Sequence, residues 1–318
     1  MALIYLTTTA EESSWNPYAL ANFNRVLKSS KHSVECRHLI TSSPNEADII
    51  LFIGSKCIYH SDIINSDIYI QFSDKSLILD FQDITIPRLP GLYTNVPSYL
   101  HQYPIYEYGF YPRVFDNELL ADRVKFSNCE YLFSFVGNSK NYPKLRQQIL
   151  NLSHSEAYLK DSFSENTKLE KTYTDILKVS KFVLCPRGIA ASTFRVFETM
   201  RSARVPVIIS DDWLPPLGLE WNEFSIKISE NDVDSIPDLL KNIEDKAEEM
   251  GKRAFDCWQA NFAIETSFDW IIKSALRIQS LRQNYSDVIK RNLYIESIQQ
   301  GHFTRFWKEL IRGKLGKT

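Results

Sequence analysis

Long apolar runs are missing from this sequence, which excludes one class of protein at once. No stretch approaches the roughly 20 apolar residues that a membrane-spanning helix needs. The first residues, MALIYLTTTAEESS, show neither a basic start nor a small-residue cleavage site, so no secretory signal peptide is predicted. We therefore expect a soluble protein.

Closely spaced cysteines are missing as well. The five cysteines are scattered, odd in number and never arranged as Cys-x-x-Cys: they are Cys36, Cys57, Cys129, Cys185 and Cys257. This pattern argues against a disulfide framework and against a zinc site, since both use cysteines at short, regular spacings. A reducing, cytoplasmic location is the expectation.

An excess of charge of one sign is absent too. The 37 Lys and Arg residues and 39 Asp and Glu residues give a formal net charge of -2, so no broad field would gather a nucleic acid. Neither a Gly-x-x-x-x-Gly-Lys phosphate loop nor a Gly-x-Gly-x-x-Gly dinucleotide loop occurs. The sequence is that of an ordinary globular protein with no nucleic-acid partner.

What the 318 residues do contain is an alternation of strand and helix patterns. In the first part, residues 2–6, 33–40 and 47–54 are predicted strands, and residues 16–30 form an amphipathic helix pattern. This βαβ pattern predicts a parallel sheet covered by helices. A chain of this length is expected to form two domains.

A second alternating series begins near residue 131. Residues 131–136 and 181–185 are predicted strands, and residues 143–150 and 192–204 are predicted helices, the second followed by the strand VPVIIS. From about Val233 the pattern is mainly helical. Two such series predict an α/β protein with two Rossmann-like domains facing each other across a cleft.

Between the two series, residues 71–113 are rich in Pro, Tyr and Asp. This segment is too long for a simple connector and too aromatic to be disordered, so we expect it to wrap one domain and line a surface. Its tyrosines suit both stacking on acceptor sugars and ordinary packing, and packing is expected for most of them. They are Tyr93, Tyr99, Tyr103, Tyr106, Tyr108 and Tyr111.

The stretch FVLCPRGIAASTFRVFETMRSARVPVIISDDW, residues 182–213, concentrates the polar chemistry. Arg187 and Gly188 follow a predicted strand, at the edge where open parallel sheets bind ligands and where a helix N-terminus favours an anion. Arg187 can fork two hydrogen bonds to a phosphate, and Gly188 permits close backbone approach. Ser192 or Thr193 would cap the following helix.

Arg195 and Glu198 lie three residues apart and so share one face of that helix. A cation near the helix start and a carboxylate one turn deeper suit a nucleoside diphosphate, because the arginine neutralises phosphate while the carboxylate accepts hydrogen bonds from two ribose hydroxyls. The same spacing also fits a solvent-exposed ion pair worth about a few tenths of a kcal/mol. Pro-Arg-Gly also fits a plain turn.

This stretch resembles the signature of the exostosin-type glycosyltransferases, family 47. Their pattern is a strand ending in Pro-Arg-Gly, then Ser-Phe-Arg and a Glu in a helix, then Val-Pro-Val and a Trp followed by Pro. YLFSFVGN resembles the strand that opens the family's donor domain, and CWQANFAIETSFDWIIKSAL resembles its closing helix. The resemblance covers roughly residues 128–280. A departure at residues 202–204, where relatives often carry a small residue, is expected to have no functional consequence.

The resemblance implies a GT-B fold with three parts: residues 1–122 as acceptor domain, 123–282 as nucleotide-sugar domain and 283–318 as a helical tail. It also implies metal-independent transfer, with inversion, of a hexosyl, pentosyl or uronosyl group from a UDP-sugar to a glycan or lipid-linked glycan in polysaccharide biosynthesis. No cofactor is expected. The adjacent Asp211 and Asp212 are not expected to form a metal site.

By the same resemblance, Arg195 would neutralise the charge on the leaving group and Glu198 would hold the ribose. The residues expected beside the donor's diphosphate are Gly137, Arg187, Gly188, Ser192 and Thr193. These roles make the central stretch the expected donor site.

The transfer also needs a base that removes the proton of the acceptor hydroxyl. Asp83 is the first candidate, because Asp-x-x-Ile-Pro resembles a loop of the family, and Asp80 and Glu107 are the alternatives. A loop aspartate that caps a turn is the structural alternative. His60 and His101 are outside candidates, since a lone histidine is more often structural.

The tail GHFTRFWKELIRGKLGKT, residues 301–318, combines apolar residues at helical spacing with an excess of basic residues. It is predicted either to lie on an anionic membrane, making the protein peripheral at its inner face, or to pack on the N-terminal domain. Two functions of different classes stay open: a glycosyltransferase, and a non-catalytic nucleotide- or glycan-binding module of the same fold. A nucleoside-diphosphate hydrolase is a third, weaker alternative. The intact set of Arg187, Arg195 and Glu198 favours the enzyme.

Overall fold

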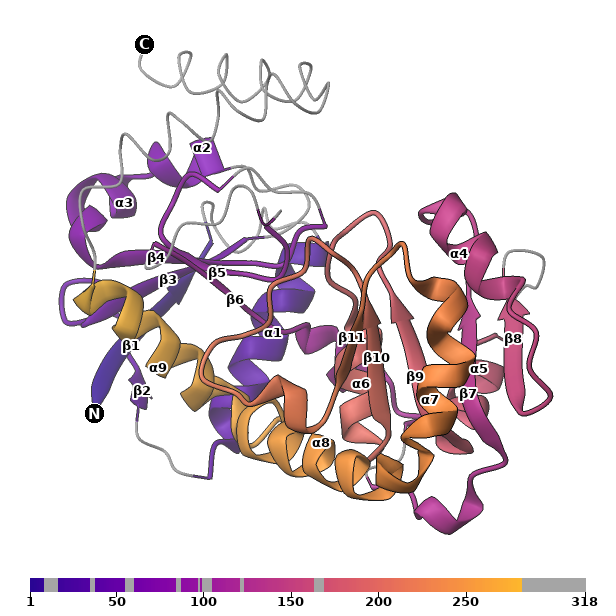
Figure 1. The fold of residues 1–318 in the computed structure, drawn as a ribbon. Coiled ribbons are helices and arrows are strands. Elements are labelled where there is room, and N and C mark those ends of the chain that lie inside the picture. The colour runs from indigo at the N-terminus through magenta and orange to yellow at the C-terminus, as the bar shows by residue number, and fades with distance from the viewer. Residues whose placement is uncertain are drawn as a thin grey trace. The chain divides into compact units, whose positions relative to one another are not determined.

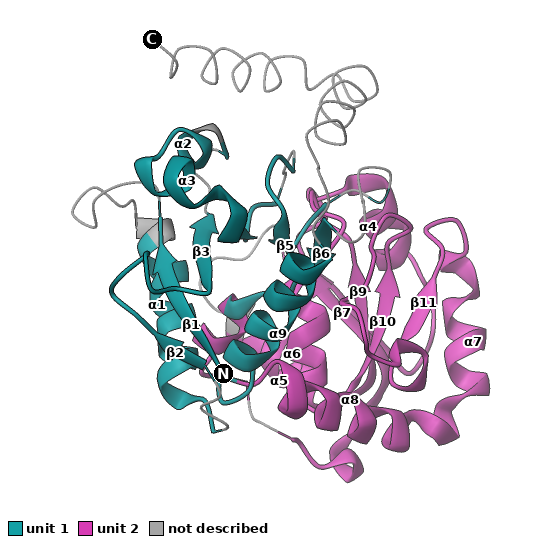
Figure 2. Cartoon of the chain, turned by 90° about the vertical axis from the view of Figure 1, so that its left-hand side faces the viewer, with its two compact units in different colours: residues 1–112, 264–318 teal, residues 113–263 magenta. Residues whose placement is uncertain are grey.

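The computed structural model divides the chain into two compact units (Figure 2). Unit 1 comprises residues 1–112 and 264–318, and unit 2 comprises residues 113–263. Among the residues that the structure describes, no helix is long and apolar enough to cross a membrane. The described residues are 1–8, 17–34, 38–54, 60–83, 87–96, 98, 105–120, 123–162 and 169–281.

Unit 1 is built on a parallel sheet with the strand order β2-β1-β3-β4-β5-β6 (Figure 1). The runs IILFIG of β3 and SLILD of β4 are buried along their whole length, as in parallel strands covered on both faces. The strands are β1 (Ala2–Thr7), β2 (His38–Ile40), β3 (Ile49–Gly54), β4 (Ser76–Asp80), β5 (Gly91–Tyr93) and β6 (Tyr106–Tyr108). The helices are α1 (Pro17–His32), α2 (His60–Ile64), α3 (Asp67–Phe72) and α9 (Ser267–Ser280).

After unit 2 the chain returns to unit 1 with helix α9. Helix α9 packs against α1, β5 and β6, and the Ser267 hydroxyl oxygen lies 2.6 Å from that of Ser29. The predicted boundaries at 122 and 282 assigned α9 to the second domain, whereas the structure groups it with unit 1, because the apolar face of α9 is buried there. The predicted tail, 283–318, lies outside the described residues.

The segment over residues 71–113 differs from its prediction as a surface-lining wrap. It supplies three strands of the unit 1 sheet, and its described tyrosines Tyr93, Tyr106, Tyr108 and Tyr111 are all buried. The hydroxyl of Tyr93 donates to the carbonyl of Leu89 at 2.6 Å. Packing, the role expected for most of these tyrosines, is therefore confirmed for these four, whereas Tyr99 and Tyr103 lie outside the described residues.

Unit 2 contains a second parallel sheet, with the strand order β11-β10-β9-β7-β8. The predicted α/β class, with a parallel sheet in each of two units, is thus confirmed. The strands are β7 (Tyr131–Gly137), β8 (Ala157–Asp161), β9 (Ser180–Pro186), β10 (Val205–Ile209) and β11 (Ile226–Ile228). The helices are α4 (Pro143–Leu150), α5 (Leu169–Lys178), α6 (Phe194–Arg201), α7 (Ile236–Asn242) and α8 (Ala247–Asn261).

Helices cover both faces of the second sheet. Helices α4 and α7 contribute Leu145, Ile149, Ile236 and Leu240 to one core cluster with β7, β9 and β10, and α7 lies in front of the sheet in Figure 1. Helices α6 and α8 contact each other and both contact β9 and β10. The strands are therefore shielded from water on both sides, which suits their apolar sequences.

Residues 202–204, the departure from the family pattern, end helix α6 and begin β10. Ala203 has a φ of 55°, in the left-handed region that stops a helix. The side chain of Arg204 is fully buried and donates hydrogen bonds to the backbone carbonyls of Val124, Lys125 and Lys178. Arg204 thus fastens the segment before β7 to the body of unit 2.

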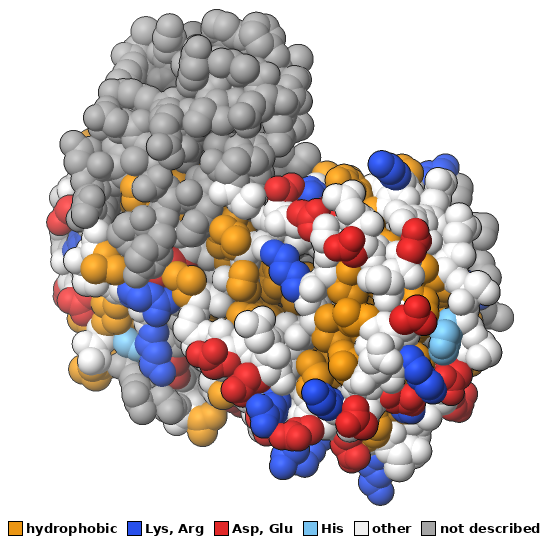
Figure 3. All heavy atoms as spheres, in the orientation of Figure 1, with side chains coloured by type: hydrophobic (Ala, Val, Ile, Leu, Met, Phe, Trp, Pro, Cys, Tyr) orange, Lys and Arg blue, Asp and Glu red, His pale blue; other side chains and the backbone are white. Residues whose placement is uncertain are grey.

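Charges of both signs are interspersed on the outside of unit 2. Figure 3 shows acidic and basic side chains side by side along the lower edge, where α8 lies in Figure 1. Within this set, Arg253 pairs with Glu249 at 2.7 Å and with Glu223 at 3.0 Å. Such exposed pairs contribute little stability and leave no broad field of one sign on this face.

Candidate functional site

The strand order of unit 2 reverses between β7 and β9. Strand β8 lies beyond β7, whereas β10 and β11 lie beyond β9, so the chain turns in opposite directions from this central pair. In open α/β sheets, ligands bind beyond the carboxyl ends of the strands at such a switch point. The segments that leave this edge are residues 138–142 after β7 and residues 187–193 after β9.

Helix α6 starts at this edge. Its N-terminus is capped by Thr193, one of the two residues, Ser192 and Thr193, that were predicted to cap it. Thr193 is the N-cap, and its side chain accepts a hydrogen bond from the backbone N–H of Arg195 at 3.4 Å. Ser192 precedes it and is buried. The helix spans eight residues, shorter than predicted because Thr193 fixes its start and Ala203 stops its continuation.

Arg195 is a buried cation at the switch point. Its Nη2 atom donates to the backbone carbonyl of Val136 at 2.7 Å, and its guanidinium group lies over the rings of Phe135 at 5.1 Å and Tyr173 at 5.2 Å. Its Nε atom is buried without a hydrogen-bond partner, and Arg195 forms no ion pair in the described part of the chain. The cation therefore retains donor capacity for an anion.

Gly137 makes room for this arginine at the end of β7. A Cβ atom at Gly137 would lie 3.1 Å from Nη2 of Arg195 and 2.7 Å from the ring of Phe135. A side chain there would displace the guanidinium group. The close approach of Arg195 thus explains the glycine at position 137. Gly188 lies in the loop after β9, and a Cβ atom there would lie 3.4 Å from Nη2 of Arg146.

Glu198 lies one turn deeper on α6 and is 3% exposed. Its Oε1 atom accepts a hydrogen bond from Nδ2 of Asn117 at 2.8 Å, and its Oε2 atom accepts one from the hydroxyl of Tyr173 at 2.6 Å. Burial raises the pKa of Glu198, and the hydrogen bonds from Tyr173 and Asn117 offset part of that shift, helped by the charge of Arg195. This is a held carboxylate, not a solvent-exposed helix pair.

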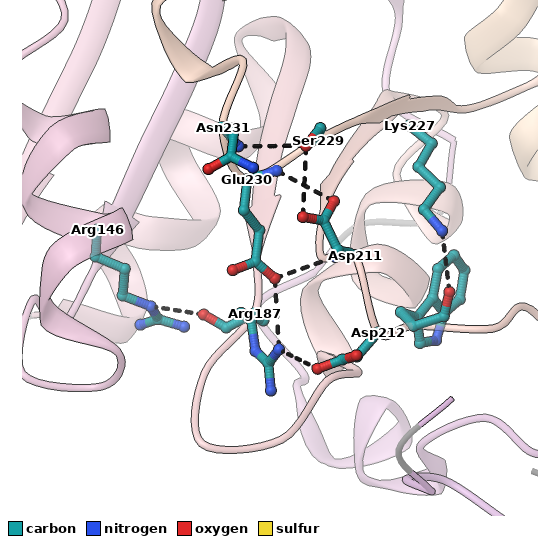
Figure 4. Close-up of polar contacts among 9 residues, drawn as sticks. Arg146, Arg187, Asp211, Asp212, Lys227, Ser229, Glu230 and Asn231 are labelled. Atoms are coloured by element: carbon teal, nitrogen blue, oxygen red, sulfur yellow. Dashed lines mark hydrogen bonds and ion pairs between the residues drawn. The ribbon is translucent and has the colours of Figure 1, made fainter. Parts of the chain in front are cut away.

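Arg187 is surrounded by acidic side chains from the ends of β10 and β11 (Figure 4). Its Nη1 atom lies 2.8 Å from Oδ2 of Asp212 and 3.4 Å from Oε1 of Glu230, and the ring of Tyr142 lies 4.6 Å from the guanidinium carbon. Burial alone would lower the pKa of Arg187, but the hydrogen bond to Asp212 and the charge of Glu230 outweigh it and raise that pKa.

Asp211 completes the same cluster through the backbone. Its N–H donates to Oε1 of Glu230 at 3.0 Å, and its own Oδ1 atom accepts from the N–H of Glu230 at 3.2 Å (Figure 4). The loops after β10 and β11 are thereby tied together. No group of three or more His, Cys, Asp or Glu side chains that could hold a metal ion was found among the described residues.

Arg146 is a further buried arginine that sequence reasoning missed. From α4 it donates through Nη1 to the carbonyl of Asn138 at 2.9 Å and through Nε to that of Arg187 at 3.0 Å, so it joins the loops after β7 and β9. Burial, with the charge of Arg195, lowers the pKa of Arg146 to about 9. It remains a cation at neutral pH and adds positive potential at the switch point.

The base candidates lie in unit 1, at or near the ends of its central strands. Asp83 is exposed, and its backbone carbonyl accepts a hydrogen bond from the side chain of Asn95. Asp80 is buried at the end of β4, where Oδ2 lies 2.8 Å from Nε2 of His60. Nδ1 of that histidine accepts the N–H of Arg88 at 3.2 Å, so Nε2 carries the proton donated to Asp80. Asp80 and His60 thus satisfy each other.

Glu107, on β6, is also internal. Its Oε1 and Oε2 atoms lie 2.7 and 2.5 Å from Nε and Nη2 of Arg277 on α9, a bidentate ion pair. Both carboxylate oxygens therefore serve to join α9 to the sheet. Of the three carboxylates named from the sequence, Asp83 is the exposed one, and His101 lies outside the described residues.

Two further residues of the site, Asn117 and Tyr173, belong to no recognisable sequence motif. Asn117 and Tyr173 are 81 and 25 residues away from the glutamate that they contact. A tyrosine within LEKTYTDILK and an asparagine in a connecting segment have no spacing that points to Glu198. Only Arg146, the fourth residue of a helix that begins beside the switch point, could have been suspected from the helix pattern.

Comparison with known proteins adds an independent finding. Residues 101–243 match the sequence model of the Exostosin GT47 domain. A 70-residue stretch is 46% identical to an exostosin-1 homolog of Caenorhabditis elegans, covering 21% of this chain and 18% of that protein. A 120-residue stretch is 33% identical to a probable glycosyltransferase of Arabidopsis thaliana, covering 37% and 24%. The matches span less than a quarter of the length of these relatives.

Solved structures show distant likeness over most of the chain. A DNA-modifying β-glucosyltransferase, solved with and without its substrate uridine diphosphoglucose, aligns with 91% of this chain and 99% of its own at 12% identity and a TM-score of 0.42. The β-glucosyltransferase of T4 phage aligns with 91% and 99% at 13% identity and a TM-score of 0.38. At these scores the likeness carries no argument about substrates.

Proposed function

We propose that this chain, whose residues 101–243 match the Exostosin GT47 domain, is a glycosyltransferase that transfers a sugar from a nucleotide-diphosphate donor to a glycan acceptor. The donor would bind at the edge of unit 2 where the strand order reverses. A UDP-sugar is the proposed donor, and inversion at the anomeric carbon is the proposed stereochemistry. Both rest on the family resemblance of the stretch 182–213.

The observation that carries this proposal is the placement of Arg195 and Glu198 one turn apart on the same face of α6. Arg195 is a buried cation without a carboxylate partner in the described residues, and Glu198 is a buried carboxylate one turn further along. A nucleoside diphosphate presents the complementary groups in the same order, with anionic phosphates followed by a ribose that carries two hydroxyl donors. The helix N-terminus capped by Thr193 adds N–H groups that favour the anion.

The chemistry needs positive charge that is in place before the sugar leaves. As the bond between sugar and phosphate breaks, negative charge grows on the diphosphate, and fixed cations stabilise this transition state more than the ground state. Arg195 would supply that charge directly, whereas Arg146 would add to the potential while its own donors hold backbone carbonyls. Because side chains provide the charge, we propose transfer without a metal ion.

Arg187 has a different place in this proposal. Its pairing with Asp212 and Glu230 leaves little uncompensated charge, so a diphosphate that contacts Arg187 must compete with these two carboxylates. We propose that Arg187 orders the loops at the carboxyl edge of the sheet. Its side chain pairs with Asp212 and Glu230, and its backbone carbonyl accepts a hydrogen bond from Nε of Arg146. Direct phosphate binding by Arg187, as the family resemblance implies, would follow only after Asp212 moves away.

The acceptor side of the proposal rests on unit 1. We propose Asp83 as the base that removes the proton of the acceptor hydroxyl, since its side chain is exposed after β4, at the carboxyl edge of the first sheet. A glycan or lipid-linked glycan precursor on the cytoplasmic side is the proposed acceptor. Asp83→Asn should abolish transfer while nucleotide affinity stays within about twofold of the wild type.

Calorimetric titration of the full chain with UDP, GDP, CMP and dTDP, each with and without EDTA, tests the donor site. We expect one nucleotide to bind equally well in EDTA, and binding to be lost in Glu198→Ala. Glu223→Ala, which removes an exposed carboxylate that pairs with Arg253, is the matched control and should bind normally. Binding that requires a divalent cation, or that survives in Glu198→Ala, would contradict the proposal.

A further inference from the structure

The carboxylate of Glu198 is held from both sides by residues that no motif includes. Nδ2 of Asn117 donates to Oε1 at 2.8 Å, and the hydroxyl of Tyr173 donates to Oε2 at 2.6 Å. Each oxygen therefore receives one hydrogen bond from the protein. The plane and rotamer of the carboxylate are fixed before any ligand arrives, because two donors on opposite oxygens oppose its rotation.

An ionised carboxylate offers about four acceptor positions, two on each oxygen. Asn117 and Tyr173 occupy one position on each, which leaves one position on Oε1 and one on Oε2. Two vicinal hydroxyls, such as O2′ and O3′ of a ribose, need this arrangement of one acceptor each. A single hydroxyl would leave one of the two remaining positions unmatched in a buried site, which is costly.

Resting on the donor site described above, we propose that Asn117 and Tyr173 are positioning residues that orient Glu198 for a vicinal diol. Together they make the site selective for ribonucleotides over nucleotides that lack the ribose hydroxyls. Neither residue needs to touch the nucleotide for this effect, since both act through the glutamate.

Both residues are themselves fixed by the arginines of α6. The ring of Tyr173, on α5, packs against the guanidinium group of Arg195 at 5.2 Å. Asn117 follows the short 3-10 helix Pro112–Asp116, and its backbone carbonyl accepts from Nη1 of Arg201 at 3.3 Å. The guanidinium group of Arg113 lies 5.5 Å from the ring of Phe194. The segment that carries Asn117 is thus fastened along the helix that carries Glu198.

The electrostatics act in the same direction as the geometry. Burial raises the pKa of Glu198, which disfavours the ionised form that can accept from two hydroxyls. The hydrogen bonds from Tyr173 and Asn117 favour the ionised form, as do the charges of Arg195 and Arg113. Loss of either donor would therefore weaken the acceptor as well as loosen it.

The test compares UDP with 2′,3′-dideoxy-UDP, which lacks both ribose hydroxyls. Dissociation constants are measured by calorimetry for the full wild-type chain and for Asn117→Ala and Tyr173→Phe. Asn128→Ala and Tyr158→Phe are the matched controls, because they remove the same groups elsewhere in unit 2. Tyr173→Phe keeps the ring that packs on Arg195, so it tests the hydroxyl with the packing intact.

We expect wild type to prefer UDP by about tenfold or more, since hydrogen bonds to a charged group are at stake. Asn117→Ala and Tyr173→Phe should each weaken UDP binding by about 5- to 20-fold and leave the dideoxy-UDP affinity unchanged. Both controls should retain the wild-type preference.

Three results would overturn the inference. Equal weakening of both ligands would show a merely structural role for Asn117 and Tyr173. Equal affinity of the wild type for UDP and dideoxy-UDP would show that the site does not recognise the ribose diol. Nucleotide binding, and hence the proposed function, would be unaffected by that result. Failure of wild type to bind UDP or any other nucleoside diphosphate would reject the proposed donor site itself.

Discussion

At the scale of single residues, the site is a contrast between paired and unpaired cations. Arg187 lies against Asp212 and Glu230, whereas Arg195 and Arg146 form no ion pair in the described residues. A buried cation that forms no ion pair is costly for the folded protein, and an anionic ligand would offset this cost. Arg195, with an unpartnered Nε, is the residue best placed to receive that ligand.

Replacing Arg195 by alanine should lower kcat by about 10²- to 10³-fold, because the cation proposed to face the leaving diphosphate is lost. Arg195→Lys should recover part of this loss, since it keeps the charge but not the guanidinium fork. The measurement is nucleotide release from the donor in the presence of acceptor, with a melting curve to confirm folding. Arg253→Ala, an exposed arginine, is the control. Wild-type turnover in a folded Arg195→Ala protein would refute the assigned role.

Replacing Asp212 by asparagine should strengthen the binding of a nucleoside diphosphate by about twofold to fivefold. The carboxylate of Asp212 competes with an anionic ligand for Arg187, and a partly exposed ion pair is worth less than about 1 kcal/mol. Calorimetry with UDP measures the change. Asp175→Asn, which removes an exposed carboxylate near Lys178, should leave the affinity unaltered. Weaker binding in Asp212→Asn would mean that this carboxylate helps to hold the ligand.

At the scale of elements, helix α6 connects the site to the rest of unit 2. Its first turns carry Arg195 and Glu198, and its last turn and the following residues hold the segment before β7 through Arg201 and Arg204. Helix α8 packs against the far end of α6, where Gly251 meets the turn at Ala203. The position of the face that carries Arg195 and Glu198 is therefore set partly by packing at the opposite end of the helix.

Gly251→Ala should destabilise the protein although alanine favours helices. A Cβ atom at Gly251 would lie 2.5 Å from the carbonyl oxygen of Ala203. Overpacking typically costs about 1–3 kcal/mol, which exceeds the gain of up to about 1 kcal/mol from helix propensity. Denaturant unfolding measures the loss, with Lys252→Ala as the exposed neighbour that should change little. A gain in stability would show that α8 can shift away without cost.

The elements also show what the sequence could and could not predict. Strand β7 follows from a run that is apolar except for Ser134, and helix α4 follows from a proline at its start; both are local signals. Strands β5 and β6 have three residues each and lie among prolines and tyrosines, so no periodicity marks them. Arg195 and Glu198 were predicted because one helix holds both. Asn117 and Tyr173 were not, because only the tertiary fold brings them to Glu198.

At the scale of the whole molecule, each unit has its own parallel sheet, and the chain enters unit 1 twice. Helix α9 belongs to unit 1 although it follows all of unit 2 in sequence. The bidentate pair between Glu107 and Arg277 is one of its anchors to the first sheet. Glu107, which the sequence made a candidate base, thus binds α9 to the first sheet and stabilises unit 1.

Glu107→Gln should lower the stability of the full chain by about 1–3 kcal/mol, since it breaks a pair whose carboxylate is buried and whose arginine is partly exposed. Its nucleotide affinity should stay at the wild-type value, and its activity should persist below the melting temperature. Thermal unfolding and UDP titration measure the two effects. Normal stability with no sugar transfer would instead make Glu107 the base.

The central claim is that a nucleoside diphosphate binds at the β7–β9 edge of unit 2. Hydrogen–deuterium exchange of the full chain, with and without saturating UDP in EDTA, tests this most directly. The account predicts slower exchange at residues 137–139 and 187–196, the ends of the two strands and the start of α6. Protection confined to unit 1, or no protection at these two segments while UDP is bound, would contradict it.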